Sequence, residues 1–269
     1  MKKVFTPLEI IEEALKVSLK DFGDDHRLKE ACSYALLSGG KRLRPLLVLQ
    51  IAESVGKGLV PIDAAVAVEF FHTASLIADD LPCMDNEQWR RGKLALHHAY
   101  GETVALLASY GLITAAFEKI HSASEGLSPQ VCAIAVKEAA QAAGLKGATT
   151  GQFYDLFPPN TNREQLERLH HLKTVTLFET AFIFGHLFGG GDESLVEGVR
   201  ECARHFGFAF QIADDIADFE EDSEEKNIAC FLGKERAEVL FQEELAAFSK
   251  AASVLPYDLD ALRLWKRDP

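Results

Sequence analysis

The stretch Asp79-Asp80-Leu81-Pro82-Cys83-Met84-Asp85, followed by Arg90-Arg91-Gly92, decides the expected fold. A second acidic cluster, Asp214-Asp215-Ile216-Ala217-Asp218, comes far downstream. Each cluster follows a long apolar run, which predicts two apolar helices that end in carboxylates. Buried carboxylates need a compensating charge. Magnesium provides one, and a magnesium ion held by a few carboxylates completes its shell with substrate phosphates. Arginine also binds phosphate through two parallel donors. The sequence therefore predicts a metal-bridged diphosphate site above an apolar pocket.

The composition limits the class of partner. The 269 residues are 48% hydrophobic, which is typical of a globular chain. A net charge of −13 argues against nucleic-acid binding and against anionic membrane surfaces. The 5 cysteines lack the spacing of a metal finger and suit reduced thiols, so we expect a cytoplasmic protein. Because no uncharged apolar run reaches membrane-spanning length and the N-terminus is charged, no integral membrane protein is expected.

Helical spacing of apolar residues predicts an all-α chain. Thr6-Pro7-Leu8-Glu9 has the pattern of a capping box with proline at the first helical position. Pro61 opens a long helix that runs through Asp80, and Pro82 ends it. Further apolar helices are expected over residues 101–120 and 194–219. No alternation is long enough to predict a strand. We expect one domain over residues 1–269, with about ten helices around a central bundle.

A glycine turn, Gly39-Gly40-Lys41-Arg42-Leu43-Arg44-Pro45, carries three cations into the next helix. Glycine lets a ligand approach the backbone, and helix N-termini favour anions, so Lys41 and Arg44 are candidate diphosphate contacts. Taken alone, however, such a motif is more often a solvated basic turn. His72, taken alone, is more often a histidine of the core.

Together the motifs resemble the trans-isoprenyl diphosphate synthase family, which includes the farnesyl and geranylgeranyl diphosphate synthases. The resemblance covers residues 39–234 and consists of the basic turn, the two acidic clusters, Gln152 to Asp155, and Lys173-Thr174. It implies a bundle of the isoprenoid synthase type around a central substrate cavity. It also implies a short-chain prenyltransferase that condenses isopentenyl diphosphate with allylic diphosphates.

The same resemblance implies roles for individual residues. The metal ligands would be Asp79, Asp80, Asp85, Asp214 and Asp218, with Asp80 in support, and they would hold three Mg²⁺ ions or, alternatively, Mn²⁺. The catalytic residues would be Lys173, Thr174 and Gln211. Substrate would contact Gly40, Lys41, Arg44, His72, Arg90, Arg91, Gln152 and Lys226. Lys226 stands in a shortened loop after Asp218, where the family usually has two lysines.

Product length follows in the family from the bulk of the residues before the first acidic cluster. Here Ala74 and Ser75 are small, and Phe71 comes one helical turn earlier. This pattern favours a C20 product, geranylgeranyl diphosphate, with C15 farnesyl diphosphate close behind.

Two other functions are considered. A non-catalytic subunit of a prenyl synthase is expected to lose acidic residues, whereas both clusters are whole. A class I terpene cyclase shares the ionisation chemistry but needs no basic turn for a second diphosphate. The resemblance also implies a homodimer, for which the apolar helix after Gly101 offers an interface.

Overall fold

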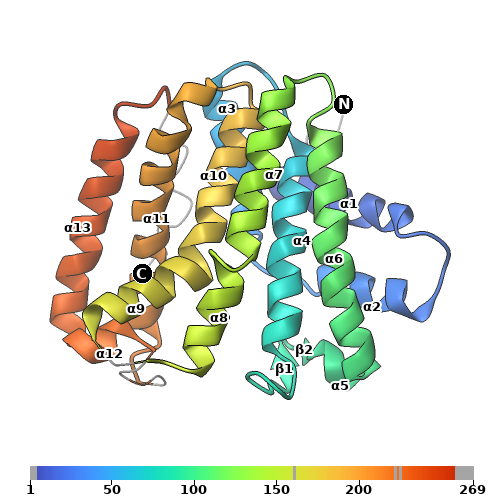
Figure 1. The fold of residues 1–269 in the computed structure, drawn as a ribbon, viewed down its shortest axis with the longest axis horizontal. Helices are drawn as coiled ribbons and strands as arrows, with labels where there is room; N and C mark the ends of the chain where they lie inside the picture. The colour runs from blue at the N-terminus through green and yellow to red at the C-terminus, as the bar shows by residue number, and fades with distance from the viewer. Residues whose placement is uncertain (1–4, 160–161, 221–222, 224–225, 258–269) are drawn as a thin grey trace.

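The computed structural model describes residues 5–159, 162–220, 223 and 226–257. It is a bundle of helices with one very small sheet (Figure 1), which confirms the predicted all-α class. The helices in chain order are α1 (Pro7–Ser18), α2 (Arg27–Leu36), α3 (Leu43–Val55), α4 (Ile62–Asp79), α5 (Leu96–Tyr100), α6 (Glu102–Ala123), α7 (Pro129–Ala143), α8 (Ala148–Leu156), α9 (Arg163–His170), α10 (Thr176–Phe188), α11 (Val196–Ala217), α12 (Ile228–Leu232) and α13 (Lys234–Ala252). Short 3₁₀ turns cover Leu19–Asp21 and Glu193–Leu195, and a π-helical turn covers His171–Val175.

The first helix begins as its capping box predicts. The hydroxyl of Thr6 accepts a hydrogen bond from the backbone N–H of Glu9, and the Glu9 carboxylate accepts one from the backbone N–H of Thr6. These two bonds satisfy donors that a helix start leaves unpaired. Pro7 occupies the first helical position.

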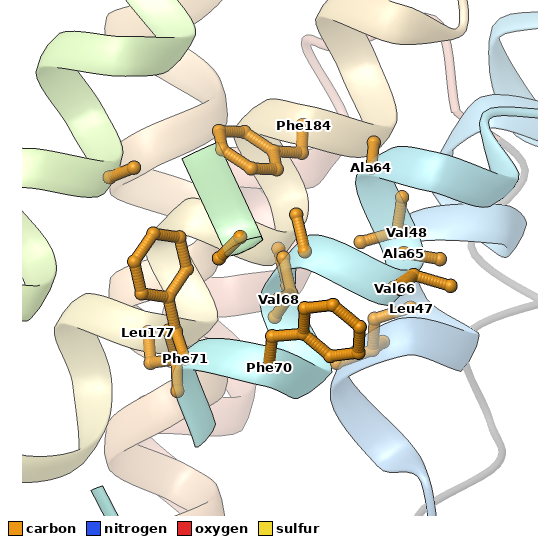
Figure 2. Packing of buried hydrophobic residues seen from close by; sticks show 14 of the residues in the cluster. Leu47, Val48, Ala64, Ala65, Val66, Val68, Phe70, Phe71, Leu177 and Phe184 are labelled. Carbon is orange, nitrogen blue, oxygen red and sulfur yellow. The ribbon is translucent and has the colours of Figure 1, made fainter. Parts of the chain in front are cut away.

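Helices α4 and α10 lie at the centre of the bundle. α4 packs lengthwise against α6, and α10 packs against α3 and α11 (Figure 1). Every residue of α10 is buried, and most of them are apolar, as expected of a central helix. The main hydrophobic cluster includes Phe70, Phe178 and Phe184, all 0% exposed, and Figure 2 shows part of it around α4. The central pair therefore provides a rigid frame for the acidic cluster that ends α4.

Two local features differ from the sequence prediction. Trp89–Arg90 (β1) and Lys93–Leu94 (β2) form an antiparallel pair, although no strand was expected there. Each strand has only two residues, which is too short for any alternation to be visible in the sequence. The helical stretch from Arg163 to Phe188 also contains a π-helical turn between α9 and α10, which the sequence did not predict. A π-helical turn requires one extra residue and leaves no compositional signal.

Helix α6 is long and apolar enough, by length and composition alone, to cross a membrane. The core helix of a water-soluble bundle meets the same criterion, and α6 packs along α4.

Candidate active site

The first acidic cluster opens onto a cavity of about 650 Å³ between α4, α6, α7 and α8. Asp79 lies at its polar end together with Lys173 and Thr174. The wall farther along is apolar or small, and it includes Phe71 and Leu177 (both labelled in Figure 2). Such a cavity offers a charged mouth and an apolar shaft, which is the shape needed by a ligand with a charged head and a hydrocarbon tail.

A second cavity of about 460 Å³ holds the residues of the basic turn and the second acidic cluster. Gly40, Lys41 and Asp214 line it. The two cavities share the lining residues Arg44, His72 and Thr174. Asp79 and Asp214, which are 135 positions apart (214 − 79), therefore line two adjoining hollows with common walls. The resemblance implied that the two acidic clusters face each other across one cavity, and their joint binding of metal stays a prediction.

The positive charge near Asp79 does not offset the cost of burying its carboxylate. Burial raises its pKa to about 6, the Coulombic attraction of Lys173 opposes the rise, and the neighbouring Asp85 adds to it. An acid held in this way favours binding of a cation. Among the described residues, no three His, Cys, Asp or Glu side chains converge closely enough to hold a metal alone. The donor set nevertheless fits magnesium, which in such sites takes only one or two carboxylates and obtains its other oxygens from phosphates and water.

Asp80 has a different environment from its neighbour Asp79. Its carboxylate is 3% exposed and accepts hydrogen bonds from the guanidinium of Arg90, with Nε at 2.9 Å from Oδ1. Both residues line a separate small hollow of about 30 Å³. Asp80 therefore fixes Arg90, which comes from β1. The predicted metal and diphosphate contacts of Asp80 and Arg90 stay predictions.

The remaining predicted acids differ in exposure. Asp85 is exposed, and its backbone N–H donates to the carbonyl oxygen of Asp79 over 2.9 Å. Asp218 is also exposed and caps the C-terminal end of α11. Both acids can reach a ligand that enters from solvent.

Cations and a neutral histidine gather where the two cavities meet. The guanidinium carbon of Arg44 lies 4.3 Å from the centre of the Phe178 ring, and burial lowers the pKa of Arg44 to about 10. Nη1 of Arg91 donates to the carbonyl oxygen of Gly39 over 2.6 Å, and Nη2 lies 3.4 Å from Nε2 of His72. Burial and the nearby Arg44 and Arg91 hold the pKa of His72 well below its usual value. His72 is therefore neutral at pH 7, and its Nε2 can accept a hydrogen bond from Arg91.

The π-helical turn positions Lys173 and Thr174 against α8. Nζ of Lys173 donates to Oδ2 of Asp155 over 2.5 Å, and Nζ of Lys226 lies 3.4 Å from Oδ1 of the same carboxylate. A Cβ atom on Gly151 would lie 2.4 Å from the backbone nitrogen of Lys173, so the two segments touch through their main chains. Gln152, the residue after Gly151, lines the large cavity, and both of its buried amide atoms lack a hydrogen-bond partner among the described residues.

Asp215, which the sequence assigned no role, is a structural residue. It is 3% exposed and accepts hydrogen bonds from Nε2 of Gln211 and from the backbone N–H of Ile228, both over 2.7 Å. The side chain of Asn227 donates to the Asp215 carbonyl oxygen over 2.8 Å. Asp215 thus orients Gln211 and ties α11 to α12. The spacing of the acidic cluster alone does not distinguish its role from that of Asp214.

The residues predicted to limit product length all line the large cavity. They are Phe71, Ala74 and Ser75 on successive turns of α4. The Phe71 ring packs edge-on against Phe117 of α6 at 5.3 Å, and the Ala74 carbonyl accepts a hydrogen bond from Ser109 over 2.9 Å. Phe117 therefore supports the floor from behind.

Comparison with known proteins shows which family the chain resembles. Residues 25–230 match the family model described as polyprenyl synthetase. The chain is 43% identical over 224 residues to a putative geranylgeranyl pyrophosphate synthase 8, chloroplastic, of Arabidopsis thaliana, and the match covers 81% of this chain and 62% of that protein. It is 41% identical over 228 residues to a chloroplastic geranylgeranyl pyrophosphate synthase of Capsicum annuum, covering 83% and 60%. The chain thus spans less than two thirds of the length of these relatives.

Solved structures are similar along nearly the whole chain. An FPP/GFPP synthase from Zymomonas mobilis superposes with a TM-score of 0.84 at 30% identity, covering 96% of this chain and 94% of that one. A geranyltranstransferase from Thermotoga maritima superposes with a TM-score of 0.79 at 32% identity, covering 92% and 91%.

Proposed function

The chain belongs to the polyprenyl synthetase family, which confirms the resemblance to trans-isoprenyl diphosphate synthases, and we propose that it condenses isopentenyl diphosphate with an allylic diphosphate. The observation that carries this proposal is the pair of adjoining cavities. One has an acidic mouth and an apolar shaft, the other has a basic turn, and both share Arg44, His72 and Thr174. Two diphosphates can thus lie side by side with their reactive carbons near a common wall.

The allylic diphosphate would lie with its head at Asp79 and its tail in the large cavity. Bound Mg²⁺ would be held by Asp79 and Asp85 on one side and by Asp214 and Asp218 on the other, and it would neutralise the charge that grows on the leaving group. Lys173, held by Asp155, donates to the departing diphosphate oxygens as the allylic C–O bond breaks. The hydroxyl of Thr174 and the amide oxygen of Gln211 face the developing allylic cation as dipoles.

Isopentenyl diphosphate would bind at Lys41, Arg44 and Arg91 in the smaller cavity. Its double bond supplies the electron pair for the new C–C bond, and loss of a proton then restores a double bond. The departing diphosphate is the base in this scheme, so no side-chain base is required. The neutral His72 can hold Arg91 in place without adding a further positive charge. The apolar shaft excludes water, which would otherwise quench the cation.

The cavity supports a C20 product, with C15 as the alternative. Ala74 and Ser75 leave space next to Asp79, and Phe71 closes the shaft with Phe117 behind it. We further propose a single domain, because the main hydrophobic cluster includes residues from Ile11 to Leu255.

The assembly and the compartment are also proposals. Helix α6 exposes Leu106, Leu107 and Tyr110, and this apolar face supports a homodimer. All five cysteines are free, which supports a reducing compartment such as the cytoplasm.

The test of the proposed function is turnover of the purified chain with labelled isopentenyl diphosphate, Mg²⁺ and each allylic primer in turn, followed by product chromatography. A synthase yields a C20 or C15 diphosphate only when both substrates are present. A hydrocarbon or alcohol formed from the allylic diphosphate alone would identify a terpene cyclase. No turnover by the folded chain would identify a non-catalytic subunit.

A further inference from the structure

Arg42 follows the glycine turn and binds three separate parts of the chain through its guanidinium group. Nε donates to Oε1 of Glu12 over 2.7 Å, Nη1 to Oε1 of Glu69 over 2.5 Å, and Nη2 to the carbonyl oxygen of Leu36 over 2.6 Å. The acceptors come from α1, α4 and the C-terminal end of α2. A planar guanidinium with acceptors in three directions has little freedom to rotate.

The burial of Arg42 separates it from the other cations of the turn. Its side chain is 0% exposed and that of Glu69 is 1% exposed, whereas Lys41 is exposed. Arg42 also has a φ of 50°, a left-handed conformation that residues other than glycine rarely adopt. The three hydrogen bonds therefore hold the backbone in an unusual conformation at the position where the turn enters α3.

Glu69 connects this buried arginine to Arg91. Its Oε1 lies 3.9 Å from Nη1 of Arg91, and the same Nη1 donates to the carbonyl oxygen of Gly39. A Cβ atom on Gly40 would lie 2.6 Å from Cζ of Arg91, so the turn and this guanidinium are in direct contact. The turn is thus held by Arg42 at one end and by Arg91 along its length, and Glu69 faces both arginines.

We propose that Arg42, with Glu12 and Glu69, forms a set of positioning residues for the diphosphate that binds at the basic turn. This inference rests on the proposed function, in which that diphosphate is isopentenyl diphosphate. Arg42 and Glu69 line the smaller cavity together with the turn, but their side chains are only 0% and 1% exposed. The role of Arg42 is therefore to orient the backbone that carries Lys41 and Arg44. Among the described residues, none of α1 lines either cavity. Helix α1 packs against α3 and α4, and its polar link to the turn is the ion pair of Glu12 with Arg42.

The kinetic test uses two conservative variants, Glu12→Gln and Arg42→Lys. The Glu12 side chain is 31% exposed, so its replacement by glutamine leaves the core packing intact. We expect the KM for isopentenyl diphosphate to rise about tenfold in both variants, since a charge-assisted hydrogen bond is lost at a site that only this substrate uses. The KM for the allylic diphosphate and kcat at saturation should stay within about threefold of the wild-type values. An unchanged KM for isopentenyl diphosphate in both variants overturns the proposal.

The matched control is Arg200→Lys, which alters another arginine bound to a buried carboxylate. Arg200 donates to Glu138 over 2.6 Å and 2.8 Å, and its side chain is 17% exposed. This pair joins α7 to α11 away from the turn. The variant should lower Tm but leave both KM values unchanged. If it raises the KM for isopentenyl diphosphate as much as Arg42→Lys does, the effect is general destabilisation and the proposal fails.

A second readout does not depend on turnover. We expect Glu12→Gln to weaken the binding of inorganic pyrophosphate to the metal-free protein, measured by calorimetry, and to speed amide hydrogen exchange at residues 39–41. Unchanged affinity and exchange, or no pyrophosphate binding by the wild type, would overturn the inference. Lack of turnover by a wild type that binds pyrophosphate at this turn would overturn only the proposed function.

Discussion

The ammonium group of Lys173 lies 2.5 Å from Oδ2 of Asp155, while Lys226, from a distant part of the chain, lies 3.4 Å from the other oxygen. One buried carboxylate thus contacts two lysines, of which Lys173 lines the large cavity. Lys226 is the single lysine left in the shortened loop, and this contact supports its predicted role near the diphosphate.

Replacement of Asp155 by asparagine removes the charge that holds both lysines. We expect Asp155→Asn to lower kcat/KM for the allylic diphosphate by about 10- to 100-fold, because a lost charge-assisted contact misplaces two cations. Steady-state kinetics with varied allylic substrate measures the change. Lys226→Met should have a smaller effect, since it leaves the Lys173 contact intact. A normal kcat/KM in Asp155→Asn would show that the lysines find their positions without this carboxylate.

The raised pKa of Asp79 predicts that the ionised carboxylate, which a metal would bind, lowers the stability of the metal-free protein. The pKa rises from 3.8 in the unfolded chain to about 6 in the folded protein. Between these values the folded state binds the extra proton, so the contribution of this group to stability is present at pH 4 and is lost as pH rises through 6. An asparagine side chain at this position would not ionise. We therefore expect Asp79→Asn to stabilise the metal-free protein by about 1–3 kcal/mol at pH 8 and to have little effect at pH 4.

Thermal unfolding of both forms at the two pH values measures this difference. Addition of Mg²⁺ with pyrophosphate should raise the Tm of the wild type more than that of Asp79→Asn, because the variant lacks a metal ligand. Equal stabilisation of both forms by Mg²⁺ and pyrophosphate would rule out Asp79 as a ligand.

The two adjacent acids of the second cluster should behave differently. Asp214→Asn is expected to lower the Mg²⁺-dependent kcat by about 10³-fold, since Asp214 lines the cavity. Asp215→Asn is expected to lower the free energy of unfolding by about 1–3 kcal/mol, since it weakens a buried acceptor of two hydrogen bonds. Chemical denaturation and kinetics on both variants check this. Similar losses of stability in the two variants would contradict the assignment.

The floor of the large cavity predicts product length. Ala74→Phe should shorten the product to C15 or less, because the new ring would fill the space between Asp79 and Phe71. Phe71→Ala should lengthen the product, because removal of the ring extends the cavity as far as Phe117. Product chromatography measures both, and Ser109→Ala, which removes the hydrogen bond to the Ala74 carbonyl but adds no bulk, serves as the control. Unchanged chain length in both variants would exclude this floor.

The exposed apolar face of α6 predicts the oligomeric state. Leu107 is 48% exposed and Tyr110 is 57% exposed. If this face is the dimer interface, Leu107→Glu should yield a monomer, because an unpaired carboxylate would be buried in the contact. Light scattering coupled to gel filtration measures the mass. Val239→Glu on α13, at a position 46% exposed, is the matched control and should leave the mass unchanged.

The sequence predicted the helices because these depend on local patterns, while most of the candidate site residues came from the resemblance to a known family. The capping box at Thr6 and the apolar run before Asp79 are examples. It did not predict contacts between distant segments. From its charge alone, Arg42 would be expected to face solvent or to bind phosphate. Its own left-handed backbone conformation instead directs the side chain into the interior. Asp215 is likewise chemically identical to Asp214, and its different role comes from contacts that include Gln211 and the distant Ile228.

The main-chain contact at Gly151 limits how this protein can be engineered. Because α8 meets the backbone of Lys173 with no room for a side chain at Gly151, that wall of the large cavity has a fixed distance from Lys173. Designers who want longer or shorter terpenoid precursors can change the side chains that α4 and α6 contribute. Substitutions at Gly151 itself would displace the backbone of Lys173, so under the proposed function a change of selectivity made there would also lower the rate.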